Sequence, residues 1–165
     1  MFQTAYSDVV NAGCNKTNLL KKNPWGYLMA SVIAGMFIAF GSFVCMTIGG
    51  IMIADNAATA KLISSLSFAS ALSLVVMAGS ELFTGNNFVM ACASFAKKVS
   101  WFDTIKLWII CFFGNLIGSW IAVILYHMTG LTKNSDVVSY FATVSAAKLS
   151  LSPLEMITRG ILCNI

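Results

Sequence analysis

Charged residues are scarce in this chain. Its 165 residues include ten Lys or Arg and six Asp or Glu, so 10% are charged while 58% are hydrophobic. A soluble domain carries about 25% charged residues, and the mean hydropathy of +0.83 departs in the same direction. The deficit argues against a soluble globular domain, a disordered chain and a nucleic-acid-binding protein. It predicts an integral membrane protein whose few charges lie in loops at the membrane surface.

Other familiar signals are missing as well. We expect no secretory signal ahead of the first apolar stretch, because the first twenty or so residues are polar. We find no metal-binding cluster, catalytic dyad or nucleotide-binding loop, so we expect neither an enzyme nor a bound cofactor. No CxxC pair occurs, and we expect the five cysteines to be small buried apolar side chains with no disulfide or metal role: Cys14, Cys45, Cys92, Cys111 and Cys163.

Long stretches without charge locate the membrane spans. Residues 23–54, 62–80, 82–96 and 107–132 contain no Asp, Glu, Lys or Arg, and a helix needs about 20 apolar residues to cross a bilayer. The first and last stretches predict helices over about 24–53 and 104–128. Asn23 and Pro24 are typical of a helix start. Gly114 and Gly118 predict close helix packing, with Asn115 between them making an interhelical hydrogen bond.

Basic residues in short loops predict the orientation. Lysines cluster before the first helix and again between 97 and 106, whereas the stretches 54–61 and 129–150 carry few. We therefore expect the N-terminus and the 97–106 loop to face the cytoplasm, and the 54–61 and 129–150 loops to face outward. This arrangement requires a single crossing between residues 61 and 97.

That crossing contains polar residues at membrane depth. The run 79–87 includes Glu81, Thr84, Gly85 and Asn86, and irregular backbone at this depth is tolerated only inside protein or along a water-filled cavity. We predict a broken helix, with halves over 62–78 and 88–96 joined by a re-entrant loop, an arrangement found at permeation sites. Glu81 has two interpretations: a functional acid, or a carboxylate that caps backbone N–H groups of the loop. We favour the second, because a bare anion would repel a permeating anion.

A fourth helix is predicted to begin at Pro153. Ser152 and Glu155 have the spacing of a capping box, with Pro153 at the first helical position. The 12 residues that follow are too few to cross a bilayer. We therefore expect the chain to be the N-terminal part of a longer protein.

These motifs resemble the formate/nitrite transporter family. The similarity lies in Gly79–Asn86, in Asn23-Pro24, in Phe113–Gly118 and in Arg159–Asn164, and it extends over the chain from about residue 23. Within the family the chain is most similar to the bacterial hydrosulfide channels, since formate channels usually have Asp and Ser where this chain has Glu81 and Gly85. The resemblance implies a channel for small monovalent anions in the bacterial cytoplasmic membrane: hydrosulfide first, formate or nitrite otherwise.

The resemblance also implies a fold. The family forms homopentamers of all-α, aquaporin-like subunits, each with its own pore and six membrane segments in two inverted repeats. This chain then holds the first repeat as one membrane domain over residues 1–165, with a broken second helix. The central histidine of the family belongs to a fifth segment that we expect to lie beyond this chain, and His127 is not its counterpart.

Individual residues match family positions. Thr84 matches a threonine that faces the central histidine, Lys148 a lysine near the central chamber, and Asn164 an asparagine near the histidine. Four residues match the two apolar constrictions: Phe68, Leu72, Leu82 and Phe83.

Simpler interpretations stay open for these residues. The Thr84 hydroxyl could bond only to a backbone carbonyl, Lys148 could be an ordinary loop lysine, and the four apolar residues could be core. The protein as a whole could also be a structural or assembly subunit of a membrane complex that transports nothing.

Overall fold

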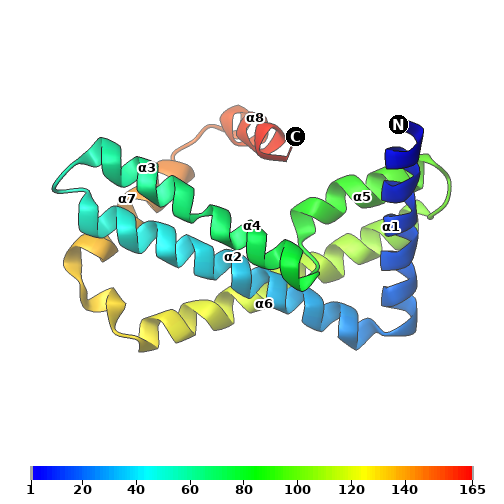
Figure 1. Cartoon of the computed structure of the whole chain (residues 1–165), viewed down its shortest axis with the longest axis horizontal. Helices are drawn as coiled ribbons and strands as arrows, with labels where there is room; N and C mark the ends of the chain where they lie inside the picture. Colours follow the sequence, from blue (N-terminus) through cyan, green and yellow to red (C-terminus); the bar gives the residue numbers. More distant parts are fainter. Residues whose placement is uncertain (1, 165) are drawn as a thin grey trace. The chain divides into compact units, whose positions relative to one another are not determined.

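The structure is a computed structural model that describes residues 2–164, and the side chains of residues 2–162. All regular secondary structure of the described chain is helical (Figure 1). Its elements follow in the order α1 (Phe2–Lys22), α2 (Pro24–Met52), α3 (Ala57–Ser67), α4 (Ala69–Ala78), α5 (Phe83–Phe95), α6 (Trp101–Met128), the 3₁₀ turn η1 (Leu131–Lys133), α7 (Ser135–Leu149) and α8 (Pro153–Asn164).

Three segments of the described chain are long and apolar enough to cross a membrane: Pro24–Met52, Ala57–Ala78 and Trp101–Met128. The prediction of apolar spans from charge-free stretches is thereby confirmed for the first and last helices. The middle span consists of α3 and α4, which are interrupted at Phe68.

The chain forms two compact units. The first unit is Met1–Ile38 with Leu74–Ile121, and the second unit is Ala39–Ser73 with Ala122–Ile165. The long helices α2 and α6 each contribute one part to each unit. We describe the units separately.

Close helix contacts organise the first unit. The helices α2 and α6 pack through Gly35 and Gly118, where an added Cβ would meet the backbone carbonyls of Asn115 and Val32. This confirms the tight packing predicted from Gly114 and Gly118. The helix α1 lies against α5 (Figure 1). A buried apolar cluster joins α1, α2, α5 and α6 through Leu20, Tyr27, Met90, Leu107 and Cys111.

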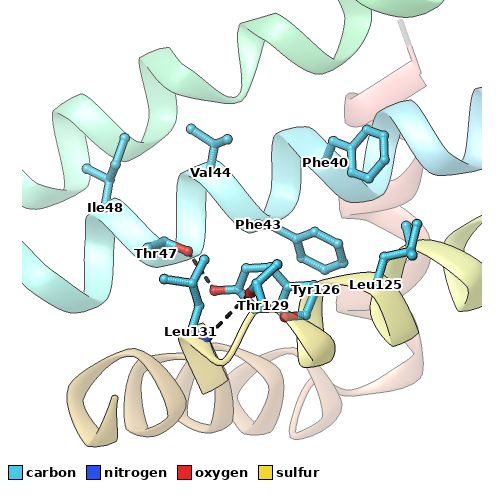
Figure 2. A pocket seen from close by; sticks show the side chains of 10 residues that line it. Phe40, Phe43, Val44, Thr47, Ile48, Leu125, Tyr126, Thr129 and Leu131 are labelled. Carbon is cyan, nitrogen blue, oxygen red and sulfur yellow. Dashed lines mark hydrogen bonds between the residues drawn. The ribbon is translucent and has the colours of Figure 1, made fainter. Parts of the chain in front are cut away.

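The second unit is held by aromatic contacts. Phe43 of α2 stacks on Tyr126 of α6, with ring centroids 4.3 Å apart, and the Tyr126 and Thr47 hydroxyls share a hydrogen bond of 2.7 Å. These side chains border an apolar pocket of about 420 Å³ (Figure 2). Gly50 of α2 lies close to the backbone of Val137 in α7.

Several predicted boundaries are wrong. Helix α1 occupies the polar N-terminal stretch, and α7 with η1 occupies most of the 129–150 stretch that was predicted as a loop. Polar residues misled the prediction in both places. In α1, however, the buried residues Val10, Gly13, Thr17 and Leu20 recur at helical spacing.

The break in the middle crossing also differs from the prediction. Helix α5 begins at Phe83, not at Phe88, so Gly85 and Asn86 belong to its first turns and not to a re-entrant loop. The connection is only Gly79–Leu82. The early start is stabilised by α6: the Asn115 side chain accepts a 2.9 Å hydrogen bond from the Phe83 N–H, which otherwise lacks a helical partner.

Candidate functional site

The candidate site is built around the short connection between α4 and α5. Gly79 adopts φ +62, a left-handed conformation suited to glycine, and it turns the chain at the end of α4. The Glu81 backbone N–H then donates a 3.2 Å hydrogen bond to the Ala30 carbonyl of α2. Glu81 is only 5% exposed. The connection therefore places a carboxylate inside the first unit.

Lys16 of α1 neutralises this carboxylate. Its Nζ lies 2.7 Å from Glu81 Oε2, and the Lys16 and Glu81 side chains are 23% and 7% exposed. The same oxygen accepts a 2.9 Å hydrogen bond from Asn86 Nδ2. The two partners come from α1 and α5, on either side of the connection. A buried carboxylate requires such partners, because burial of an unpaired charge costs far more than pairing it.

Asn86 extends the cluster to α2 and α6. Its amide nitrogen also lies 2.9 Å from the Tyr27 hydroxyl, and Trp108 Nε1 donates to its backbone carbonyl over 3.2 Å. Asn86 is 2% exposed and Tyr27 is fully buried. Residues far apart in the sequence are thus joined in one buried polar network, and such networks rigidify a core when every member is bonded.

The Asn115 side chain of α6 also holds the connection in place through hydrogen bonds. Its Nδ2 donates to the Ser31 carbonyl over 2.8 Å and to the Glu81 carbonyl over 3.0 Å, while its Oδ1 accepts from Phe83. The interhelical hydrogen bond predicted for Asn115 is therefore confirmed. The Glu81 carbonyl also accepts from the Cys111 thiol at 3.2 Å. One amide side chain ties together α2, α6 and the start of α5.

The role of Glu81 differs from the one expected. Among the described residues, its carboxylate bonds to Lys16 and Asn86 side chains, not to backbone N–H groups of the connection. The favoured interpretation, a carboxylate that caps backbone N–H groups of the connection, is therefore wrong for the described residues.

Thr84 lies directly after this cluster, in the first turn of α5, and is exposed. Within the described part of the chain its hydroxyl makes no hydrogen bond, so the simpler interpretation, a bond to a backbone carbonyl, is wrong for this structure. Gly85 follows it, and a Cβ added there would meet no atom within 4 Å. The hydroxyl is consequently available to another group.

Leu82 and Phe83 are half-buried. Leu82 is the extended residue that precedes α5, and the Phe83 ring contacts Phe112 edge to face with centroids 5.4 Å apart. In the first unit, therefore, the predicted site residues Glu81 and Asn86 are in direct contact. The segment between them in the sequence consists of Leu82, Phe83, Thr84 and Gly85.

The other predicted site residues belong to the second unit. Phe68 lies at the break between α3 and α4 and is 42% exposed, while Leu72 in α4 is 56% exposed. Lys148 is exposed in the last turn of α7, where a cation also suits the helix dipole. Asn164 ends the described part of α8, and its side chain lies outside the described residues.

Sequence reasoning missed Lys16 as a member of the site. It counted only as a topological signal, because α1 was not predicted. The spacing of Val10, Gly13, Thr17 and Leu20 indicates an amphipathic helix, and Lys16 stands beside that buried stripe. An acid in an apolar span and a lysine beside a buried helix face are together the signal for this pair.

Comparison with known proteins gives consistent matches. A family model described as "Formate/nitrite transporter" matches residues 3–165. The chain is 31% identical over 160 residues to the uncharacterized transporter YwcJ of Bacillus subtilis, covering 97% of this chain and 62% of YwcJ. It is 28% identical over 167 residues to the nitrite transporter NirC of Escherichia coli, covering 96% of this chain and 60% of NirC.

A solved structure is also similar. The chain aligns to one described as an "FNT family ion channel" with a TM-score of 0.82 and 25% identity, over 91% of this chain and 59% of that one. The chain thus spans about three fifths of the length of these relatives.

Proposed function

The chain belongs to the formate/nitrite transporter family, and on that premise we propose that it is part of a membrane channel for small monovalent anions. Hydrosulfide is the proposed substrate, with formate and nitrite as the alternatives. We further propose that the protein is a homopentamer with one pore in each subunit, in a bacterial cytoplasmic membrane with its N-terminus in the cytoplasm.

The observation that carries the proposal is the neutralised carboxylate in the middle crossing. A bare Glu81 would repel an anion, whereas the Lys16 contact at 2.7 Å leaves this segment without net charge. Directly after it, α5 begins, and its positive dipole end lies beside the exposed Thr84 hydroxyl. The segment thus offers hydrogen-bond donors and a favourable dipole to an anion, without an opposing charge.

In the proposed mechanism each of these residues has a separate role in binding or selecting the anion. Lys148 attracts the anion by its charge. The apolar constrictions, Phe68 and Leu72 with Leu82 and Phe83, remove its water and so restrict passage to small species. Thr84 then donates a hydrogen bond, and Asn164 completes the chamber.

The choice of hydrosulfide rests on two positions. Glu81 and Gly85 stand where formate channels usually have Asp and Ser. Because Gly85 has no side chain, it leaves open space beside Thr84. The name of the similar Escherichia coli protein refers to nitrite. The chemistry that the three anions share, a small size and a single negative charge, is what the proposed site would recognise.

Anion flux through proteoliposomes reconstituted with the full-length protein tests the residue roles. Replacing Thr84 by Ala removes the hydroxyl, and loss of a hydrogen bond to a charged group predicts a fall in anion flux of about tenfold or more. Thr84→Ser should retain most of the flux. Thr143→Ala is the matched control, because the Thr143 hydroxyl already bonds to the Ser139 carbonyl of its own helix.

Charge reversal tests the attraction step. Lys148→Glu should lower anion flux strongly, whereas Lys133→Glu, an equal change at another exposed lysine, should have little effect. Unchanged flux and selectivity in both Thr84→Ala and Lys148→Glu would reject the mechanism. A protein with no anion flux at all would favour the alternative, a structural subunit.

A further inference from the structure

A second charged site lies in the first unit, away from Glu81. Side chains of α1, α2 and α6 border a pocket of about 270 Å³. Two lysines, Lys21 and Lys106, and one acid, Asp103, provide its charge, and Pro24 at the start of α2 forms part of its wall. Buried Thr17 and Leu20 contribute its α1 side.

The charges of this pocket do not cancel. Lys21 Nζ lies 2.8 Å from Asp103 Oδ2, and the two side chains are 59% and 24% exposed. Lys106 is exposed, and within the described part of the chain its ammonium makes no hydrogen bond and no ion pair. The pocket therefore has a net charge of about +1 at neutral pH, with unused donors on both lysines. An anion fits this pattern better than a cation or a neutral molecule.

The surroundings place the pocket at the level of lipid headgroups. Both adjoining membrane helices begin here, and each has an exposed tryptophan at its start: Trp25 is the second residue of α2 and Trp101 the first of α6, with exposed fractions of 73% and 45%. Tryptophans of membrane proteins gather at the membrane–water interface. This pattern favours a position of the lysines at the level of phospholipid phosphates.

We propose that this pocket binds the phosphate of an anionic phospholipid, with Lys106 and Lys21 as its donors. Basic pockets between membrane helices are a recognised means of binding anionic headgroups. In this protein the headgroup would contact α1 and α6 together. The lipid would thereby help to hold α1, the helix that supplies Lys16 to the polar cluster.

In a simpler account, the Lys21–Asp103 ion pair only holds α1 against α6. That account gives Lys106 only a charge interaction with Asp103 and no effect on lipid preference, so Lys106 separates the two accounts. Lys106→Gln leaves the Lys21–Asp103 pair in place, and Lys106→Arg keeps the charge. Lys98→Gln is the matched control, because Lys98 is an exposed lysine in the short stretch before α6 and outside the pocket.

The test measures quenching of tryptophan fluorescence by brominated phosphatidylglycerol and brominated phosphatidylcholine in vesicles that contain the protein. Replacing Trp101 and Trp120 by Phe keeps Trp25 beside the pocket as the main exposed reporter. The ratio of the two apparent association constants reports preference for the anionic lipid. One lysine near an anionic surface contributes about 1 kcal/mol, which predicts a fall in this ratio of about fivefold for Lys106→Gln.

The expected pattern is a ratio reduced in Lys106→Gln and retained in Lys106→Arg and Lys98→Gln. Equal ratios in Lys106→Gln and the parent protein would overturn the proposal, and so would an equal fall in Lys98→Gln, which would indicate only a general surface charge. A free inorganic phosphate in the same vesicles should leave quenching unchanged. Reversal of the quenching by that phosphate would show a soluble anion site and reject the lipid.

Discussion

Removal of Lys16 should destabilise the protein more than removal of any lysine at the surface. Lys16→Met keeps the length and most of the apolar stem of the side chain but takes away the ammonium. Glu81 would then keep only the Asn86 amide as a side-chain partner for its carboxylate. Because the Glu81 side chain is only 7% exposed, water cannot replace the lost ammonium group of Lys16.

The magnitude follows from that burial. Breaking a buried ion pair by removing one partner costs about 3–5 kcal/mol, and the 23% exposure of Lys16 puts the expected loss near the lower end, about 3 kcal/mol. Glu81→Gln should cost less, because the remaining Lys16 ammonium reaches solvent. The double variant Lys16→Met with Glu81→Gln should recover part of the loss, because it leaves no buried charge.

Urea unfolding in mild detergent micelles, followed by tryptophan fluorescence, measures these differences. Lys21→Met is the control, since the Lys21–Asp103 pair is 2.8 Å long, close to the 2.7 Å of Lys16–Glu81, but has exposed fractions of 59% and 24%. A pair that exposed contributes about 0–1 kcal/mol. If Lys16→Met lowers the free energy of unfolding no more than Lys21→Met does, Glu81 is not a buried anion held by Lys16.

Two further predictions concern packing and capping. In the same unfolding assay, Gly118→Ala should cost at least about 1–3 kcal/mol, because the new methyl group meets the Val32 carbonyl, while Gly160→Ala, with no atom within 4 Å of the new group, should be neutral or gain about 0.5 kcal/mol. Hydrogen bonds from the Ser152 backbone N–H and hydroxyl hold the pKa of the Glu155 carboxyl below its ordinary value. This cap therefore stabilises α8 at a pH above the unfolded-state pKa of Glu155, and the stabilisation is lost as the pH falls through the lowered pKa of the folded state. An NMR titration should show a higher Glu155 pKa in Ser152→Ala. An unchanged pKa would contradict the capping box.

Local patterns in the sequence predicted much of the fold. Charge-free stretches located two membrane helices, α2, which begins at Pro24, and α6, which ends at Met128, since a bilayer tolerates few charges. The capping box predicted from Ser152 and Glu155 is confirmed, with the Ser152 N–H donating to Glu155 Oε2 over 2.8 Å. These features depend on residues within a few positions of one another, so the sequence displays them directly.

The candidate site was only partly predictable. Glu81 was recognised because an acid in an apolar stretch is costly, but its partner Lys16 lies 65 residues away in a helix that was not predicted. Local patterns can mark each of the two residues, but they do not show that the two residues meet. The start of α5 was misplaced for a related reason, since the group that caps Phe83 is the side chain of Asn115, 32 residues further along the chain.

The proposal of an anion channel is tested most directly by comparing fluxes of hydrosulfide, formate and nitrite through one proteoliposome preparation of the full-length protein, with gluconate as a large monovalent anion for reference. The account predicts rapid flux of the small anions, with hydrosulfide fastest, and no measurable gluconate flux. Equal flux of gluconate and the small anions, or no flux of any of them above that of empty liposomes, would contradict it.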